Sequence, residues 1–210
     1  TLVHEMGHSL FAWLFGCWSV PAFDLRYGGG VALTSPRQST AILACVYAGF
    51  VGMAWVSRRN TLALATAAVL AGLHAGIAFT GWRNIGFFSM GHGGELLFAA
   101  LALYRGVAGK DTAHGLERLA YAGVGWFMVL HNLLFDWGLM TSGHERFWYG
   151  QAKGGGHWMD FDQIASRLGL SLELVAAGFF LAGVLTPFAA FLAFRYRSYV
   201  YAVIDRLQPR

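Results

Sequence analysis

The first twenty residues read TLVHEMGHSLFAWLFGCWSV (1–20), and they combine a polar motif with an apolar helix. His4, Glu5 and His8 form the pattern H-E-x-x-H, which places two imidazoles on the same side of a helix. The residues after His8 are mostly apolar, as in a membrane helix. Ionisable side chains are costly at membrane depth, so this group indicates a functional site.

The composition of the whole chain indicates a membrane environment. Of 210 residues, 56% are hydrophobic and only 12% are charged, and the mean hydropathy is +0.48. Soluble domains carry roughly 25% charged residues, so this chain lacks the charge to cover a normal water-facing surface. The net charge of +4 is small and lies in short arginine clusters, which does not indicate a nucleic-acid surface. We therefore predict an integral membrane protein without a nucleic-acid partner.

Apolar runs define the predicted architecture, because about 20 apolar residues span a bilayer as a helix. The runs cover residues 1–20, 39–56, 61–81, 84–104, 116–140 and 170–194. They predict an all-α fold class, a polytopic bundle of about six transmembrane helices in one integral-membrane domain over residues 1–210. Because the chain begins with Thr1 rather than Met, we expect its opening helix to be truncated.

Two polar segments interrupt the apolar runs. Residues 21–38 contain Gly28-Gly29-Gly30 and two prolines, and they predict a short Gly-rich β-hairpin or a re-entrant loop after the first helix. Residues 141–170 form the longest polar stretch, for which we expect a solvated lid. Its acidic and imidazole side chains, His157, Asp160 and Asp162, could bind metal, but a place in the lid is the simpler interpretation.

The opening motif suits a hydrolytic metal site. His4 and His8 offer two neutral imidazoles to one ion, which favours Zn²⁺, although Fe²⁺ or Co²⁺ accepts the same ligands. Glu5 is placed beside them to accept a proton from water at the metal, so we predict it as the catalytic base. A zinc hydrolase also needs a third protein ligand and an open position.

Candidates for the third ligand lie in the fourth and fifth apolar runs. His92 is the first choice, with Glu95 one turn later as a carboxylate that supports the ligands. Asp136 and His131 are the alternatives, since either could approach the metal. An interhelical hydrogen-bond cluster that includes Asn132 accounts for that second group equally well. His74, alone in the third run, is predicted to pack between helices.

Taken together, these motifs resemble the site-2 protease family of intramembrane zinc metalloproteases. Its members carry H-E-x-x-H on one membrane helix and a later segment N-x-x-P-x-x-x-L-D-G-G, whose Asp is the third ligand. Here Asn84 precedes His92 by eight residues, which is the same offset, and Gly93-Gly94 match the paired glycines. The segments LLFAALALYRG, GHSLFAWLFG and ACVYAGFVGMAW and the Gly-rich hairpin look like a bacterial branch of this group.

The resemblance implies specific roles. His4, His8 and His92 would bind zinc, with His92 in place of the family's Asp, and Asn84 would position the substrate. Gly86, Phe87 and Phe88 replace the prolines of the family pattern. The resemblance also implies that the two metal-bearing helices run parallel, whereas two apolar runs between them predict an antiparallel pair.

The function that the resemblance implies is intramembrane proteolysis. The cofactor would be Zn²⁺, the substrate a membrane protein or peptide, and the location a lipid bilayer, the bacterial inner membrane. Two other classes fit the residues: a membrane metalloenzyme that does not cut proteins, and a non-catalytic scaffold that retains the motif. Glu5 disfavours the scaffold, because a scaffold needs no general base.

Overall fold

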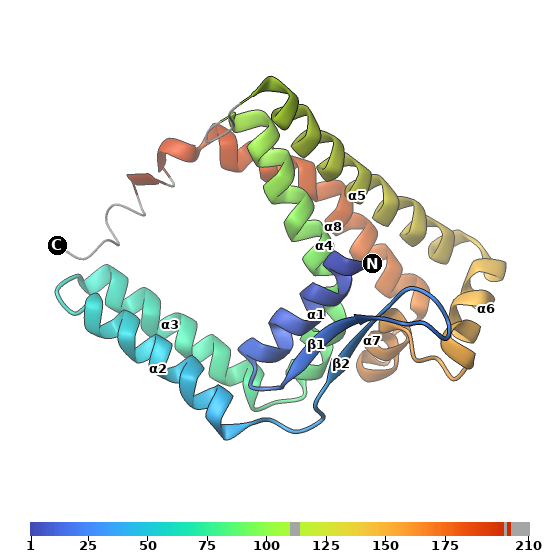
Figure 1. Cartoon of the computed structure of the whole chain (residues 1–210), viewed down its shortest axis with the longest axis horizontal. Helices are drawn as coiled ribbons and strands as arrows, with labels where there is room; N and C mark the ends of the chain where they lie inside the picture. The colour runs from blue at the N-terminus through green and yellow to red at the C-terminus, as the bar shows by residue number, and fades with distance from the viewer. Residues whose placement is uncertain (110–113, 200, 203–210) are drawn as a thin grey trace.

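The computed structural model describes residues 1–109, 114–199 and 201–202, which are mostly helical (Figure 1). This confirms the predicted all-α class at the level of helical content. The long helices are α1 (Leu2–Leu14), α2 (Thr40–Val56), α3 (Thr61–Ala78), α4 (Trp82–Ala108), α5 (Gly115–Thr141) and α8 (Leu172–Arg195). The shorter elements are β1 (Ser19–Phe23), β2 (Gly30–Thr34), α6 (Gly143–Gln151), the 3₁₀ turn η1 (Ala152–Gly154) and α7 (Asp160–Leu168).

Three helices in the described residues are long and apolar enough to cross a membrane, namely α3, α4 and α8. α2 is also apolar but has only 17 residues. α1 has 13 residues, which span about 20 Å at 1.5 Å per residue, less than a hydrocarbon core of roughly 30 Å. The helices are thus compatible with a membrane protein.

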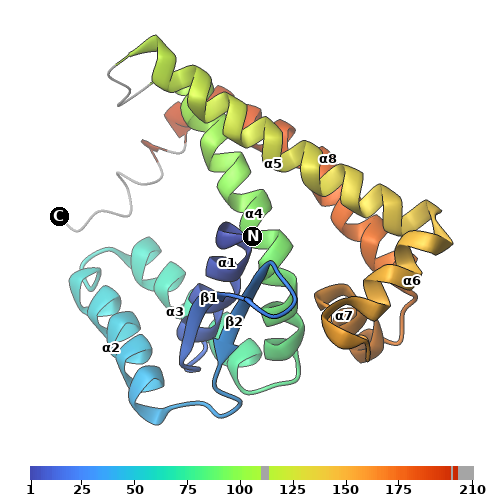
Figure 2. The same cartoon turned by 45° about the vertical axis from the view of Figure 1, so that its right-hand side comes forward.

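The helices form two groups that diverge from one end of the molecule (Figures 1 and 2). α4, α5 and α8 pack along one another, and α7 packs on α4 and α8. α2 and α3 contact mainly each other, and α2 buries none of its residues. A helix that is apolar all round and covered by no other element is expected to face lipid.

α1 crosses α4 in the antiparallel direction. The Cα of Gly94 lies near Gly7, while Gly86, nearer the start of α4, lies against the ring of Phe11. A Cβ on Gly7 would lie 2.0 Å from the carbonyl oxygen of Met90, so only glycine permits this approach. The direction follows from the two intervening helices, and the parallel pair that the resemblance implies is not found.

The Gly-rich segment forms an antiparallel pair of strands on α1, with Phe23 opposite Gly30 and Ser19 opposite Thr34. The side chain of Asp24 accepts hydrogen bonds from the backbone N–H groups of Arg26 and Tyr27, which closes the turn between the strands. Gly28 and Gly29 follow with positive φ angles of 78° and 88°. The turn therefore places β2 beside the opening motif of α1.

Candidate metal centre

The two histidines of α1 lie one turn apart, and their Nε2 atoms are 3.2 Å from each other. His8 is buried with 4% of its surface exposed, and His4 is half-buried. α1 stops soon afterwards, at Gly16 with φ +81°, where the N–H of Cys17 bonds to the carbonyl of Ala12. This turn directs the chain back along α1 into the strands that cover the motif.

The third side chain that meets both histidines comes from α7. Oδ2 of Asp160 lies 2.9 Å from Nε2 of His4 and 3.0 Å from Nε2 of His8. Around tetrahedral zinc, with bonds of about 2.0–2.1 Å, neighbouring ligand atoms are about 3.3 Å apart. Three donors at 2.9, 3.0 and 3.2 Å form nearly this triangle, so the residues present fit a zinc ion.

The start of α7 is held in place by apolar packing and a hydrogen bond. Phe161, next to Asp160, is fully buried in the core with Ile164 and Val175. Its backbone N–H donates to the hydroxyl of Tyr149 on α6 at 3.1 Å. Asp160 is therefore presented to α1 by the same contacts that dock α7.

The other ring nitrogens of the two histidines orient the imidazoles. Nδ1 of His8 donates a hydrogen bond of 2.7 Å to the backbone carbonyl of Phe87. Nδ1 of His4 lies 3.8 Å from Oε2 of Glu95, a carboxylate that is 6% exposed. Partners of this kind fix the tautomer that points Nε2 at a metal. Glu95 thus lies where the sequence predicts a supporting carboxylate.

Gly91 on α4 forms the floor beneath the two imidazoles. A Cβ at this position would lie 2.5 Å from Nε2 of both His4 and His8. A side chain here would occupy the space into which both rings project. The absence of one is a second feature that fits a metal ion at this point.

His92 lies beside His4 but does not join His8. The two rings meet edge to face with centroids 4.7 Å apart, and Nδ1 of His92 donates to Oδ1 of Asn132 at 2.8 Å. The amide of Asn132 in turn donates to Oε2 of Glu95 at 3.1 Å. His92, predicted as the third ligand, forms with His4 and Glu95 a second group of side chains that could hold a metal, and Asn132 links it to a buried network behind His4. In the described part of the chain, the residue that joins both motif histidines is Asp160.

The other predicted residues lie outside this centre. His131 is exposed, stacks on Phe127 and lines the cavity onto which the centre opens, but it is in neither group of possible metal ligands. Asp136 is fully buried, and neither of its oxygens has a hydrogen-bond partner among the described residues. Asn84, the predicted substrate-positioning residue, is exposed in the first turn of α4. At 1.5 Å per residue it lies about 12 Å along the helix from His92. His74 is buried and bonds Tyr47 and the carbonyl of Leu14, consistent with packing.

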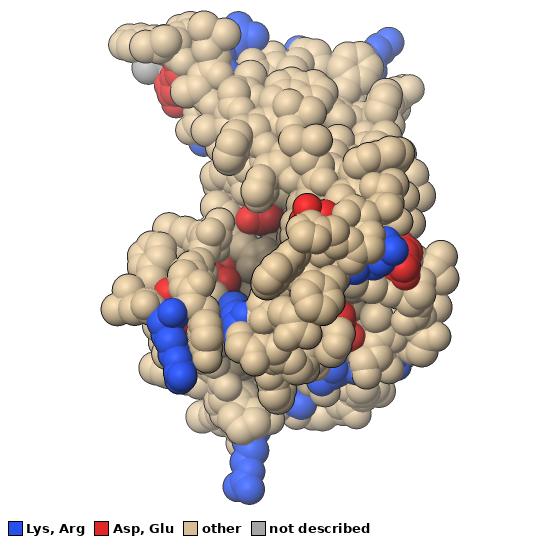
Figure 3. Space-filling model, turned by 90° about the vertical axis from the view of Figure 1, so that its right-hand side faces the viewer, with Lys and Arg blue, Asp and Glu red and all other residues tan. Residues whose placement is uncertain are grey.

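The centre opens into a cavity of about 610 Å³ that α1, β2, α4 and the segment before α7 line. Glu5 is 6% exposed, and its carboxylate is so close to Gly30 that a Cβ there would lie 2.6 Å from Oε1. Lys153 also lines the cavity and donates a 2.9 Å hydrogen bond from Nζ to the carbonyl of the same Gly30. Figure 3 shows this side of the molecule to be hollowed, with acidic groups at the edge.

Asp160 carries the negative charge that a metal ligand needs. Burial raises the pKa of its carboxyl, but hydrogen bonds from His4 and His8 outweigh burial and hold the pKa well below its usual range. The sequence predicts Asp160 as part of a solvated lid that could bind metal, and it does not connect this residue to His8, from which 152 positions separate it. The one local signal is an acidic residue in the first turn of a short amphipathic helix.

The chain matches no family model, curated protein or solved structure in the three comparisons made with known proteins. Its function therefore has to be argued from the geometry of the centre.

Proposed function

We propose that the chain is a membrane-embedded zinc hydrolase in which His4, His8 and Asp160 hold the metal and Glu5 is the general base. The observation that carries this proposal is the meeting of two Nε2 atoms and a carboxylate oxygen, 2.9–3.2 Å apart, in a cavity that Glu5 also lines. Two imidazoles and one carboxylate are a zinc ligand set that leaves a fourth position open. The non-catalytic scaffold is less favoured, because Glu5 is not held in any structural hydrogen bond among the described contacts.

Each residue of the centre has a separate proposed role in hydrolysis. When bound, zinc supplies Lewis acidity and lowers the pKa of water to about 7. His4 and His8 hold their Nε2 atoms forward through Glu95 and Phe87, and Asp160 supplies the anionic ligand. Glu5 accepts a proton from the attacking water and then donates it to the leaving nitrogen of a peptide bond.

The substrate that we propose is a peptide bond of a membrane protein. β2 lines the cavity from Gly30 to Ala32, so an extended peptide could bind along this strand by main-chain hydrogen bonds. α2, α3, α4, α5 and α8 follow five of the six apolar runs, while α1 covers only residues 2–14 of the first run, whose last two residues belong to β1. We propose that all six helices lie in the bilayer, with α1 inserted without spanning it. The bacterial inner membrane is the location that the site-2 protease resemblance implies.

The test is zinc content and proteolysis of the full chain purified in detergent, with a fluorogenic transmembrane peptide as substrate. We expect one zinc per chain in the wild type and in Glu5→Gln, with no cleavage by that variant. Asp160→Ala should lose the zinc, while His92→Ala should keep it. Cleavage at the wild-type rate by Glu5→Gln would refute the general-base role. Zinc retained in Asp160→Ala but lost in His92→Ala would restore His92 as the third ligand.

A further inference from the structure

A second cavity of about 360 Å³ lies on the other side of Phe87 and Phe88 from the metal centre. Its apolar walls include Phe11 of α1 and Phe15 just after α1, and two arginines also line it, Arg83 and Arg167. Volumes of 300–1,000 Å³ are typical of small-molecule sites. The cavity therefore combines a size that suits a ligand with walls that are part apolar and part cationic.

The two arginines come from different elements. Arg83 is half-buried in the first turn of α4, and Arg167 is in the last turn of α7. The guanidinium of Arg167 is oriented by a 2.6 Å hydrogen bond to Oε1 of Gln163, and its carbon lies 4.7 Å above the ring of Phe88. A guanidinium held in this way loses little further freedom when it pairs with an anion.

The positive charge of this cavity is not neutralised by the described part of the protein. No Asp or Glu lines the cavity. Among the described residues, neither Arg83 nor Arg167 forms an ion pair with a carboxylate, in contrast to Arg146, which pairs with Glu173. The N-terminal end of α4, a helix of 27 residues, adds a partial positive charge at Arg83. Three positive contributions therefore meet at one cavity that has no internal counter-charge.

We propose that the second cavity binds a phosphate group. Arginine forks match phosphate oxygens in bidentate geometry, and helix N-termini bind the same anions. Two sources share this chemistry: the head group of an anionic membrane lipid, whose acyl chains would contact the phenylalanine wall, and free inorganic phosphate. The site is separate from the metal centre, so the proposal does not depend on the proposed hydrolysis.

The experiment measures the melting temperature of the full chain in detergent with three additives: phosphatidylglycerol, phosphatidylcholine and inorganic phosphate at constant ionic strength. Ligands that bind only the folded state raise the melting temperature. We expect phosphatidylglycerol to raise it more than phosphatidylcholine, whose own cation competes with the arginines. The effect should weaken as salt rises from 50 to 300 mM, because charge pairing is screened.

Variants separate this site from general membrane binding. Arg83→Gln with Arg167→Gln should weaken phosphatidylglycerol binding by about tenfold or more, and Arg83→Lys with Arg167→Lys should restore part of it. Arg58→Gln, which removes a similar charge at the far α2–α3 turn, should bind as the wild type does. Far-ultraviolet circular dichroism and the melting temperature without additive report whether each variant is folded.

Each outcome decides the proposal. Stabilisation by phosphatidylglycerol alone identifies a lipid phosphate, and stabilisation by inorganic phosphate identifies free phosphate. No stabilisation by either, or equal binding by the wild type and the double glutamine variant, overturns the proposal.

Discussion

At the scale of single residues, the candidate metal centre consists of three possible ligand side chains and of a glycine, Gly91, that leaves room for them. His4 and His8 are aligned by the helix period of α1, and Asp160 reaches both at 2.9 and 3.0 Å. Gly91 leaves room for the two rings, since a Cβ there would contact both. The donors and the space between them come from three different helices, so no single element contains the centre.

The first prediction concerns Gly91→Ala. The methyl group would lie 2.5 Å from Nε2 of both histidines and displace them, so zinc affinity should fall at least about tenfold, which is 1.4 kcal/mol. The matched control is Gly93→Ala, where the nearest heavy atom is 3.7 Å away. Both changes favour the helix by up to about 1 kcal/mol, so a folded Gly91→Ala protein with normal zinc affinity in a chelator competition would contradict the assignment.

The second prediction concerns Asn132, which joins His92 to Glu95 by hydrogen bonds of 2.8 and 3.1 Å. Asn132→Leu keeps the branched shape of the side chain but leaves two buried polar groups without a partner, at a cost of about 1–3 kcal/mol each. We expect a lower melting temperature and, because Glu95 lies behind His4, zinc affinity weakened by about 10- to 100-fold. Thr141→Leu, a change at an exposed polar residue of α5 that does not line the cavity, is the control. Unchanged zinc affinity would show that the network does not support His4.

At the scale of elements, residues 152–159 link α6 to α7 and contact the hairpin on the way. We name this segment the strap. Its residues from Lys153 to His157 all have positive φ angles, which glycine adopts readily and other residues rarely do. The strap leads directly into Asp160 at the start of α7, and Lys153 ties it to Gly30 on β2. The position of Asp160 therefore depends on a segment that contacts Gly30 of β2, the same residue that the carboxylate of Glu5 contacts.

The third prediction concerns Lys153→Ala, which removes the hydrogen bond from the strap to Gly30. Loss of about 1 kcal/mol should shift the equilibrium between the bound strap and a detached strap about fivefold toward the detached state. We expect faster zinc release to a chelator in stopped-flow measurements, and faster proteolytic cleavage within the strap. Lys153→Arg, which keeps a donor of similar reach, should recover most of the wild-type rate. Identical release rates in all three proteins would show that this contact does not secure Asp160.

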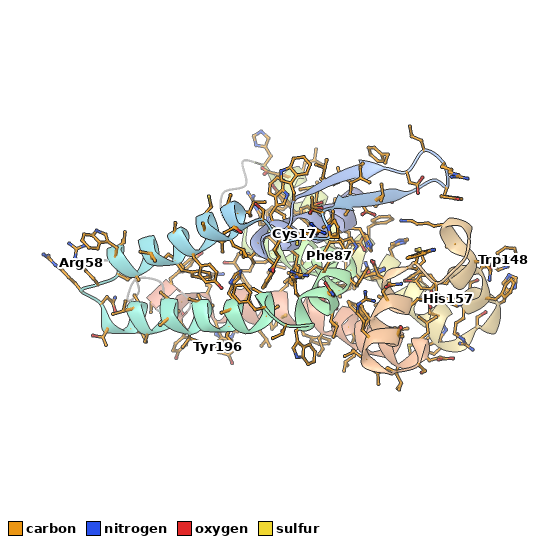
Figure 4. The ribbon with its side chains drawn as sticks, turned by 90° about the horizontal axis from the view of Figure 1, so that it is seen from below. Cys17, Arg58, Phe87, Trp148, His157 and Tyr196 are labelled. Carbon is orange, nitrogen blue, oxygen red and sulfur yellow. The ribbon has the colours of Figure 1, made fainter. Side chains whose placement is uncertain are left out.

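At the scale of the whole molecule, the two helix groups leave much of the apolar surface exposed. Figure 4 places Arg58 at one end of the molecule, Trp148 and His157 at the other, and Phe87 between them. α2 and α3 expose large apolar residues along their length, among them Val51, Trp55 and Leu73 at 61–68%. Contiguous apolar surface of this extent is not stable in water, so we assign it to lipid.

The fourth prediction tests that assignment. A nitroxide label at Val51 of α2, introduced in a Cys17→Ala, Cys45→Ala background and reconstituted in vesicles, should be accessible to oxygen and protected from a water-soluble nickel reagent. A label at His157, exposed at the opposite end, should show the reverse by electron paramagnetic resonance. Equal access of the nickel reagent to both labels would mean that α2 does not lie in the bilayer.

Sequence alone was enough for the features that depend on neighbouring residues. Helical content follows from apolar runs, the pairing of His4 with His8 from the helix period, and the presence of helices apolar enough to cross a membrane from the low charge. The antiparallel direction of α1 and α4 also follows from counting the two runs between them. Each of these is a local property or a simple consequence of chain order.

Only the tertiary structure decided which residue completes the centre. Asp160 meets His8 across 152 positions of sequence, and it does so because Phe161 and Tyr149 dock α7 in the core. The spacing from Asn84 to His92 matches a motif, but across the antiparallel crossing His92 groups with His4 and Glu95, whereas Asp160 groups with both motif histidines. A local sequence pattern identifies candidate metal ligands, whereas the packing of helices that are distant in the sequence determines which of these ligands lie close together.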